Sequence, residues 1–225
     1  MTLLTSEIFE FLNELKLNNN REWMTTHKTR YLQNERNLKS FYNEIKSGLN
    51  TFDRIDTLKV FRINRDIRFS QNKTPYNVHR SASFSREGAD RRGGYYLRLQ
   101  PGNSRIAGGF FSPEPADLLR IRKEFEMDDT EIREILNNAD FKKAFKGFNT
   151  DNQVKTAPRG FSADHPANDL IKNKSFFLSR AFTDDEVFAS DFKEKVLAHY
   201  RLLIPFFDYM SDVLTTDLNG VSLLD

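Results

Sequence analysis

The stretch YYLRLQPGNSRIAGGFF, residues 95–111, decides the fold of this chain. Its first part, 95–100, and its last part, 105–111, have the composition of strands, and the turn signal PGNS lies between them. The pattern predicts two antiparallel strands joined by a tight turn. Inside the second strand, Gly108-Gly109 indicates a bulge or the close approach of another backbone or a ligand.

Around this hairpin, further elements follow from hydrophobic spacing and from start and stop signals. Strands are expected at 58–63, 78–84, 154–157 and 175–182, and helices at 6–15, 21–49, from 113, from 128, from 183, and at 191–214 with a kink at Pro205. Asn19 followed by Glu22 predicts a capping box at the start of the second helix.

The order of these elements predicts the fold class. The chain is helical over 1–50, mainly β over 58–112 and mainly helical over 113–225, and strands and helices do not alternate regularly. This order favours an α+β fold, in which an antiparallel sheet from the middle of the chain packs against the N- and C-terminal helices. A length of 225 residues suits a single domain over 1–225.

Composition excludes several classes of protein. The chain has no cysteine, which excludes disulfides, thiolate zinc sites and a cysteine nucleophile. The net charge of +2 argues against a protein that coats nucleic acid with its whole surface. The first residues lack the pattern of a signal peptide, and no apolar run approaches the ~18 residues of a membrane span. We therefore expect a cytoplasmic protein with no membrane partner.

The strongest functional signal is a local excess of positive charge. Residues 59–80 contain one acid, Asp66, and six basic residues: Lys59, Arg62, Arg65, Arg68, Lys73 and Arg80. Guanidinium groups bind carboxylates and phosphates through paired hydrogen bonds. The predicted anion-binding residues are Arg62, Arg65, Arg68 and Lys73, with Asp66 orienting an arginine.

Tyr76 and His79 are the nearest candidates for proton transfer, because they lie beside this basic segment and carry titratable groups. The other histidines, His27, His165 and His199, are interpreted as structural. No pair of histidines has the spacing of a metal site and no nucleotide-binding loop motif occurs, so the sequence predicts no metal and no cofactor.

Three functions fit these observations. The first is binding of a phosphorylated or carboxylated small molecule, and the sequence does not decide whether that molecule is also a substrate of an enzyme. The second is a nucleic-acid-binding module, in which Tyr95 or Tyr96 stacks on bases and further arginines extend the positive surface: Arg86, Arg91, Arg92 and Arg98. The third is a structural or interaction protein whose arginines form internal ion pairs. The oligomeric state does not follow from the sequence.

Several blocks of the chain also resemble, in order, the uncharacterised domain-of-unknown-function family numbered 2461. The blocks that carry the resemblance are residues 11–31, 61–70, 73–76, 95–97, 101–102, 108–109 and 157–161. Met24, Asn77 and Thr156 depart from the pattern of that family. The resemblance implies a single intracellular domain and implies no particular activity.

Overall fold

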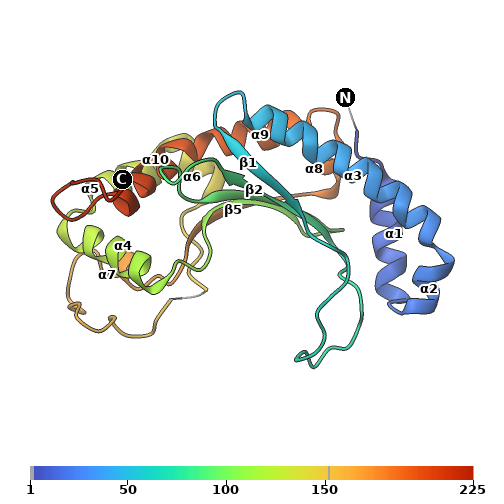
Figure 1. The fold of residues 1–225 in the computed structure, drawn as a ribbon, viewed down its shortest axis with the longest axis horizontal. Coiled ribbons are helices and arrows are strands. Elements are labelled where there is room, and N and C mark those ends of the chain that lie inside the picture. Colours follow the sequence, from blue (N-terminus) through green and yellow to red (C-terminus); the bar gives the residue numbers. More distant parts are fainter. Residues whose placement is uncertain (1–2, 152, 225) are drawn as a thin grey trace. The chain divides into compact units, whose positions relative to one another are not determined.

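A computed structural model describes residues 3–151 and 153–224 of the chain. Within these residues, ten helices accompany a five-stranded antiparallel sheet (Figure 1). The strands are β1 (Ile55–Val60), β2 (Arg80–Arg86), β3 (Gly94–Leu99), β4 (Ser104–Phe110) and β5 (Phe176–Phe182), and they are paired in sequence order. The predicted α+β fold with an antiparallel sheet is confirmed.

Three helices precede the sheet: α1 (Ser6–Leu17), α2 (Arg21–Thr26) and α3 (Lys28–Leu49). The predicted helix over 21–49 is therefore divided at His27, whose ring stacks on Trp23 with the centroids 4.0 Å apart. The predicted capping residue was wrong by one position. Asn20, not Asn19, accepts the Trp23 N–H at 2.9 Å and caps α2.

Seven helices follow β4. They are α4 (Pro115–Met127), α5 (Thr130–Asn137), α6 (Ala139–Phe145), α7 (Asn168–Ile171), α8 (Asp184–Phe188), α9 (Phe192–Leu202) and α10 (Ile204–Thr215). Pro205 lies in the first turn of α10, so the helix predicted over 191–214 breaks at Leu203. The strand predicted at 154–157 is absent from the described residues, where this region contributes an isolated bridge between Gln153 and Asn173.

The chain divides into two compact units. Unit 1 comprises residues 1–84, 96–106 and 181–198, and unit 2 comprises 85–95, 107–180 and 199–225. The division passes through β2, β3, β4 and β5, each of which has residues in both units. The prediction of one domain stays a prediction.

Aromatic side chains fill the core of each unit, as the 21 phenylalanines suggest. In unit 1, Phe41 stacks on Phe192 with centroids 5.9 Å apart. In unit 2, the ring of Tyr95 lies 4.8 Å from that of Tyr200. A Cβ on Gly109 would collide with the carbonyl oxygen of Phe176 in β5, which confirms the close backbone approach predicted for Gly108-Gly109.

Candidate anion-binding site

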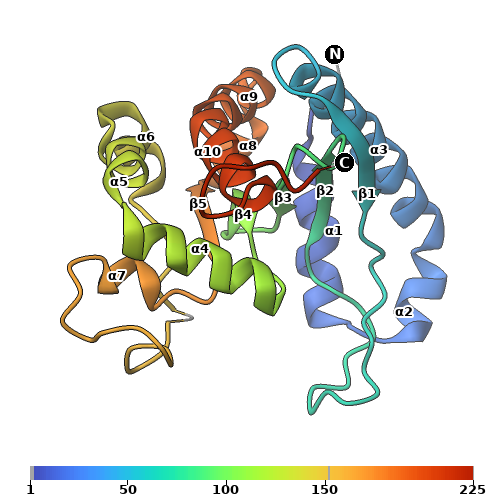
Figure 2. The same ribbon diagram turned by 60° about the vertical axis from the view of Figure 1, so that its left-hand side comes forward.

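Loop 61–79 carries most of the residues that the sequence predicts for the site. It leaves β1 and returns to β2 as an irregular hairpin within unit 1 (Figure 2). The Arg65 N–H donates to the Pro75 carbonyl at 2.8 Å, and the Asn77 N–H donates to the Ile63 carbonyl at 2.7 Å. The two arms of the loop are therefore joined by backbone hydrogen bonds.

Arg65 holds the loop from inside. Its guanidinium group donates to the Thr74 carbonyl at 3.0 Å, to the Thr74 hydroxyl at 2.5 Å and to the Ser70 hydroxyl at 3.3 Å. All three partners are neutral hydroxyl or carbonyl groups of the loop itself. Arg65 thus donates its hydrogen bonds to groups of its own loop and thereby fixes the shape of the loop.

The other charged residues of the loop are exposed. Arg68 forms two hydrogen bonds to the carboxylate of Asp66, at 3.0 and 2.6 Å. Arg68 is the main cause that lowers the pKa of Asp66, and the charge of Arg62 lowers it further. The Lys73 ammonium donates to the Ile67 carbonyl at 3.1 Å. Asp66 thus holds the guanidinium group of Arg68, and the Ile67 carbonyl holds the ammonium group of Lys73.

Tyr76 is fixed through its backbone. The Asn19 side chain donates to the Tyr76 carbonyl and accepts the Tyr76 N–H, both at 3.0 Å. This amide reproduces the pair of hydrogen bonds that a neighbouring strand would make. The turn between α1 and α2 thereby anchors the returning arm of the loop just before His79.

Arg80 is a structural residue. Its guanidinium group binds both carboxylate oxygens of Glu35 on α3, at 2.6 and 2.7 Å, and its side chain is 4% exposed. Tyr31, one helical turn away on α3, also lies near this pair. Burial is the main cause that raises the pKa of Tyr31, and the charge of Glu35 adds to it. For Arg80, the geometry fits the interpretation that the arginines form internal ion pairs.

The structure brings His79 next to an arginine pair on β3 and β4. The Asn103 N–H donates to the Gln100 carbonyl at 2.9 Å, so these two residues are opposite each other at the end of the hairpin. Two residues further from the turn on each strand, Arg98 lies opposite Arg105. Leu97 and Leu99 are buried on one face of β3, so Arg98 points to the other face. We call His79, Arg98 and Arg105 the sheet-face cluster; all three belong to unit 1.

The electrostatics of the sheet-face cluster are unfavourable without an anion. Burial is the main cause that lowers the pKa of His79 to about 4, and the charges of Arg98 and Arg80 contribute. Burial likewise lowers the pKa of Arg98; Tyr96 acts against this shift, and the charge of Arg105 adds to it. Among the described residues, neither Arg98 nor Arg105 forms an ion pair with a carboxylate.

Polar neighbours hold the two guanidinium groups without neutralising them. Arg98 donates to the Gln100 side chain, and Arg105 donates to the Asn103 side chain. The Nε atom of each arginine is buried and has no hydrogen-bond partner within the described residues. A buried N–H without a partner is costly, and a bound anion would supply the acceptor.

Sequence reasoning missed Arg105 and assigned Arg98 to a different surface. The signal was present, because both arginines lie two residues outside Gln100 and Asn103, the ends of the turn. Equal distances from a two-residue turn place two residues opposite each other on one face of a hairpin. The six basic residues along 59–80 led to a predicted site in the loop instead.

Three of the residues predicted for a nucleic-acid surface are engaged inside unit 2: Arg86, Arg92 and Tyr95. The side chain of Arg86 is 2% exposed and donates to Asp208 at 3.1 Å. Arg92 forms an ion pair with Asp117, and Tyr95 is 1% exposed. Base stacking requires an accessible ring, which Tyr95 does not offer.

Residues 3–151 and 153–224 contain neither a candidate metal cluster nor a candidate membrane-spanning helix. No group of three or more histidine or carboxylate side chains there is arranged to hold a metal ion. No helix in that part of the chain is both long and apolar enough to cross a membrane.

Comparison with known proteins places the chain in one family. The model of the conserved hypothetical protein family DUF2461 matches residues 7–209. The chain therefore belongs to this family, as the order of its sequence blocks suggested. No curated protein and no solved structure matches the chain.

Proposed function

We propose that this protein binds a small phosphorylated or carboxylated molecule at the sheet-face cluster, with Arg98 and Arg105 holding the anion beside His79. The observation that carries the proposal is the pair of opposed arginines, whose buried Nε atoms have no acceptor within the described residues. Like charges directly across a strand pair are destabilising unless something neutralises them. An oxyanion that accepts from both guanidinium groups would do so.

Loop 61–79 supports this site in the proposal. Arg65 and the pair of Asp66 and Arg68 keep the shape of the loop. Arg62 and Lys73 are exposed cations that raise the local positive potential and attract anions. The residues predicted from the sequence thus have different roles, and Arg98 and Arg105 join them.

His79 and Tyr76 stay the candidates for proton transfer. A pKa of about 4 makes His79 neutral at pH 7, so its imidazole ring can accept a hydrogen bond. An anion bound to Arg98 would offset the positive charges near His79 and raise its pKa toward the usual value. A catalytic role of either residue and a cytoplasmic location are further parts of this proposal.

Isothermal titration calorimetry at low ionic strength tests the proposal. The probes are inorganic phosphate, glycerol phosphate and citrate, and the variants are Arg98→Gln and Arg105→Gln. The matched control is Arg36→Gln, an exposed arginine on α3 in the same unit. Loss of one charge-assisted contact should weaken binding about tenfold or more, while the control binds like the wild type. No binding of any probe to the wild type, or an equal loss in the control, would overturn the proposal.

A further inference from the structure

A loop tip with an exposed aromatic ring is the most unusual surface feature that the anion site does not explain. Phe69 is 96% exposed, the highest value among the exposed large hydrophobic residues. It lies in loop 61–79, which we call the finger. The guanidinium carbon of Arg68 lies 6.0 Å from the centroid of the Phe69 ring. Isolated exposed apolar residues are ordinary, but aromatic rings are enriched at protein–protein interfaces.

The finger is ordered by its own hydrogen bonds. Arg65 ties Thr74 and Ser70 together, and Lys73 donates to the Ile67 carbonyl. The Asn72 side chain accepts from the Thr74 N–H at 2.9 Å. A loop that is already fixed in one shape loses little conformational entropy when it binds a partner. Phe69 is therefore presented as a preorganised anchor.

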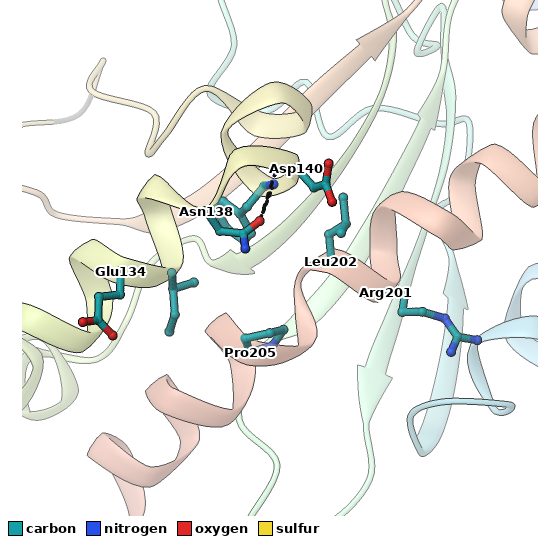
Figure 3. A pocket seen from close by; sticks show the side chains of 8 residues that line it. Glu134, Asn138, Asp140, Arg201, Leu202 and Pro205 are labelled. Carbon is teal, nitrogen blue, oxygen red and sulfur yellow. Dashed lines mark hydrogen bonds between the residues drawn. The ribbon is translucent and has the colours of Figure 1, made fainter.

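A cavity in unit 2 has the complementary properties. It has a volume of about 420 Å³ and is lined by Asn138, between α5 and α6, and by residues of α5, α6, α9 and α10: Glu134, Ile135, Asp140, Phe141, Arg201, Leu202 and Pro205 (Figure 3). Four of these side chains are apolar and can receive a phenyl ring, which buries about 150–250 Å² on binding. A cavity of this size is within the range of pockets that bind small groups.

The lining of the cavity carries two carboxylates, Glu134 and Asp140, and one guanidinium group, Arg201, so its net charge is opposite in sign to that of the finger. Glu134 and Asp140 lie at separate places on its rim, and the guanidinium group of Arg201 points away from both in Figure 3. Neither carboxylate forms an ion pair with a described residue. On the finger, Arg68 pairs with Asp66, while Arg62 and Lys73 are exposed and Arg65 has neutral partners, so the finger carries a net positive charge. Such complementarity favours encounter between the two surfaces.

We infer that the finger of one copy of this protein inserts Phe69 into the α5–α10 cavity of a second copy. Each contact buries little more than one ring and its flanking cations, well below the ~1,200 Å² of a stable interface. The association is therefore weak, and the fraction of dimer rises with protein concentration. It weakens in high salt, because exposed charges contribute to it. This inference does not depend on the anion site.

Photo-crosslinking from the finger tests this inference, and the absence of native cysteine makes the labelling specific. Gln71→Cys, an exposed position near Phe69, carries a benzophenone maleimide label. The expected product is a crosslinked dimer whose joined peptides contain residues 134–141 or 201–205 of the other copy. Adding Phe69→Ser should reduce that product about tenfold, since the ring supplies most of the buried apolar area.

Leu17→Ser is the matched control, because Leu17 is also strongly exposed, at 84%, and lies on α1. This variant should leave the crosslinked dimer unchanged. Sedimentation velocity over the same concentration series should show Phe69-dependent dimers. The inference is overturned if crosslinks between copies map outside the cavity or if no dimer forms at any concentration. Phe69-dependent binding to anionic phosphatidylserine vesicles without dimers would also overturn it and assign the finger to a membrane surface.

Discussion

Arg80 and Arg98 belong to neighbouring strands of the same unit, yet their surroundings are opposite. Arg80, on β2, faces α3 and binds both oxygens of Glu35. Arg98, on β3, faces the other side of the sheet, where the charge of Arg105 acts on it and the neutral His79 lies nearby. The first arginine completes an internal ion pair, and the second adds to an excess of positive charge. Stability is therefore expected to depend on Arg80, and anion binding on Arg98.

The largest expected effect is the loss of the Arg80–Glu35 pair. Arg80→Met leaves the Glu35 carboxylate, whose side chain is 13% exposed, without its partner. Breaking a buried pair from one side costs about 3–5 kcal/mol in the free energy of unfolding. Urea denaturation measures this cost, and the double variant Arg80→Met, Glu35→Met should recover most of it. A loss below about 1 kcal/mol in the single variant would remove the contrast with Arg98.

Next in size is the anchor of the loop. Asn19→Ala removes both hydrogen bonds to the backbone of Tyr76 and should lower the free energy of unfolding by about 1–2 kcal/mol. Hydrogen exchange should show faster exchange of the Tyr76 amide, while amides inside α3 keep their protection. Asn13→Ala, at an exposed position on α1, is the control. Unchanged exchange at Tyr76 would mean that the anchor does not order the loop.

The pH dependence of stability follows from His79. Its pKa is about 4 in the folded protein and about 6.5 in the unfolded chain, so the unfolded state binds more protons between these values. The stability contributed by the neutral ring is complete above pH 6.5 and is lost as the pH falls toward 4. Because the ring is partly exposed, we expect a loss of about 1 kcal/mol.

His79→Gln should flatten this part of the stability curve in urea denaturations from pH 4 to 7. Inorganic phosphate should have a similar effect in the wild type, because the anion stabilises the protonated ring. If His79→Gln leaves the slope unchanged, the ring does not have the surroundings described here.

The smallest expected effect is a gain. Arg105→Gln removes a like charge directly opposite Arg98 and should raise the free energy of unfolding by a few tenths to about 1 kcal/mol in phosphate-free buffer. The same substitution weakens phosphate binding, so one variant becomes more stable and binds less. Arg36→Gln should change neither quantity. A destabilised Arg105→Gln would indicate that Arg105 holds the fold and not a ligand.

Much of the fold could be predicted because its signals are local. The turn at 101–104, the crowding at Gly109 and the helix break at Pro205 each depend on the chemistry of a few consecutive residues. The division at His27 was missed because the spacing of apolar residues continues across it. Such spacing reports the buried face of a helix and not where the helix ends.

The candidate site was harder to predict because its members are joined by strand pairing. A run of arginines along 59–80 shows that charge is concentrated, but not which partner each arginine meets. Arg65 meets hydroxyl and carbonyl groups of its own loop, and Arg80 meets Glu35, 45 positions earlier in the chain. The position of Arg105 opposite Arg98 follows only from the register of β3 and β4.

The most direct test of the account observes the arginine Nε–H signals by ¹⁵N NMR while inorganic phosphate is added. The account predicts saturable shifts for Arg98 and Arg105, whose Nε atoms have no acceptor among the described residues. It predicts no shift for Arg80, whose Nε already donates to Glu35 at 2.6 Å. Linear shifts confined to exposed arginines such as Arg62, with Arg98 and Arg105 unmoved, would contradict it.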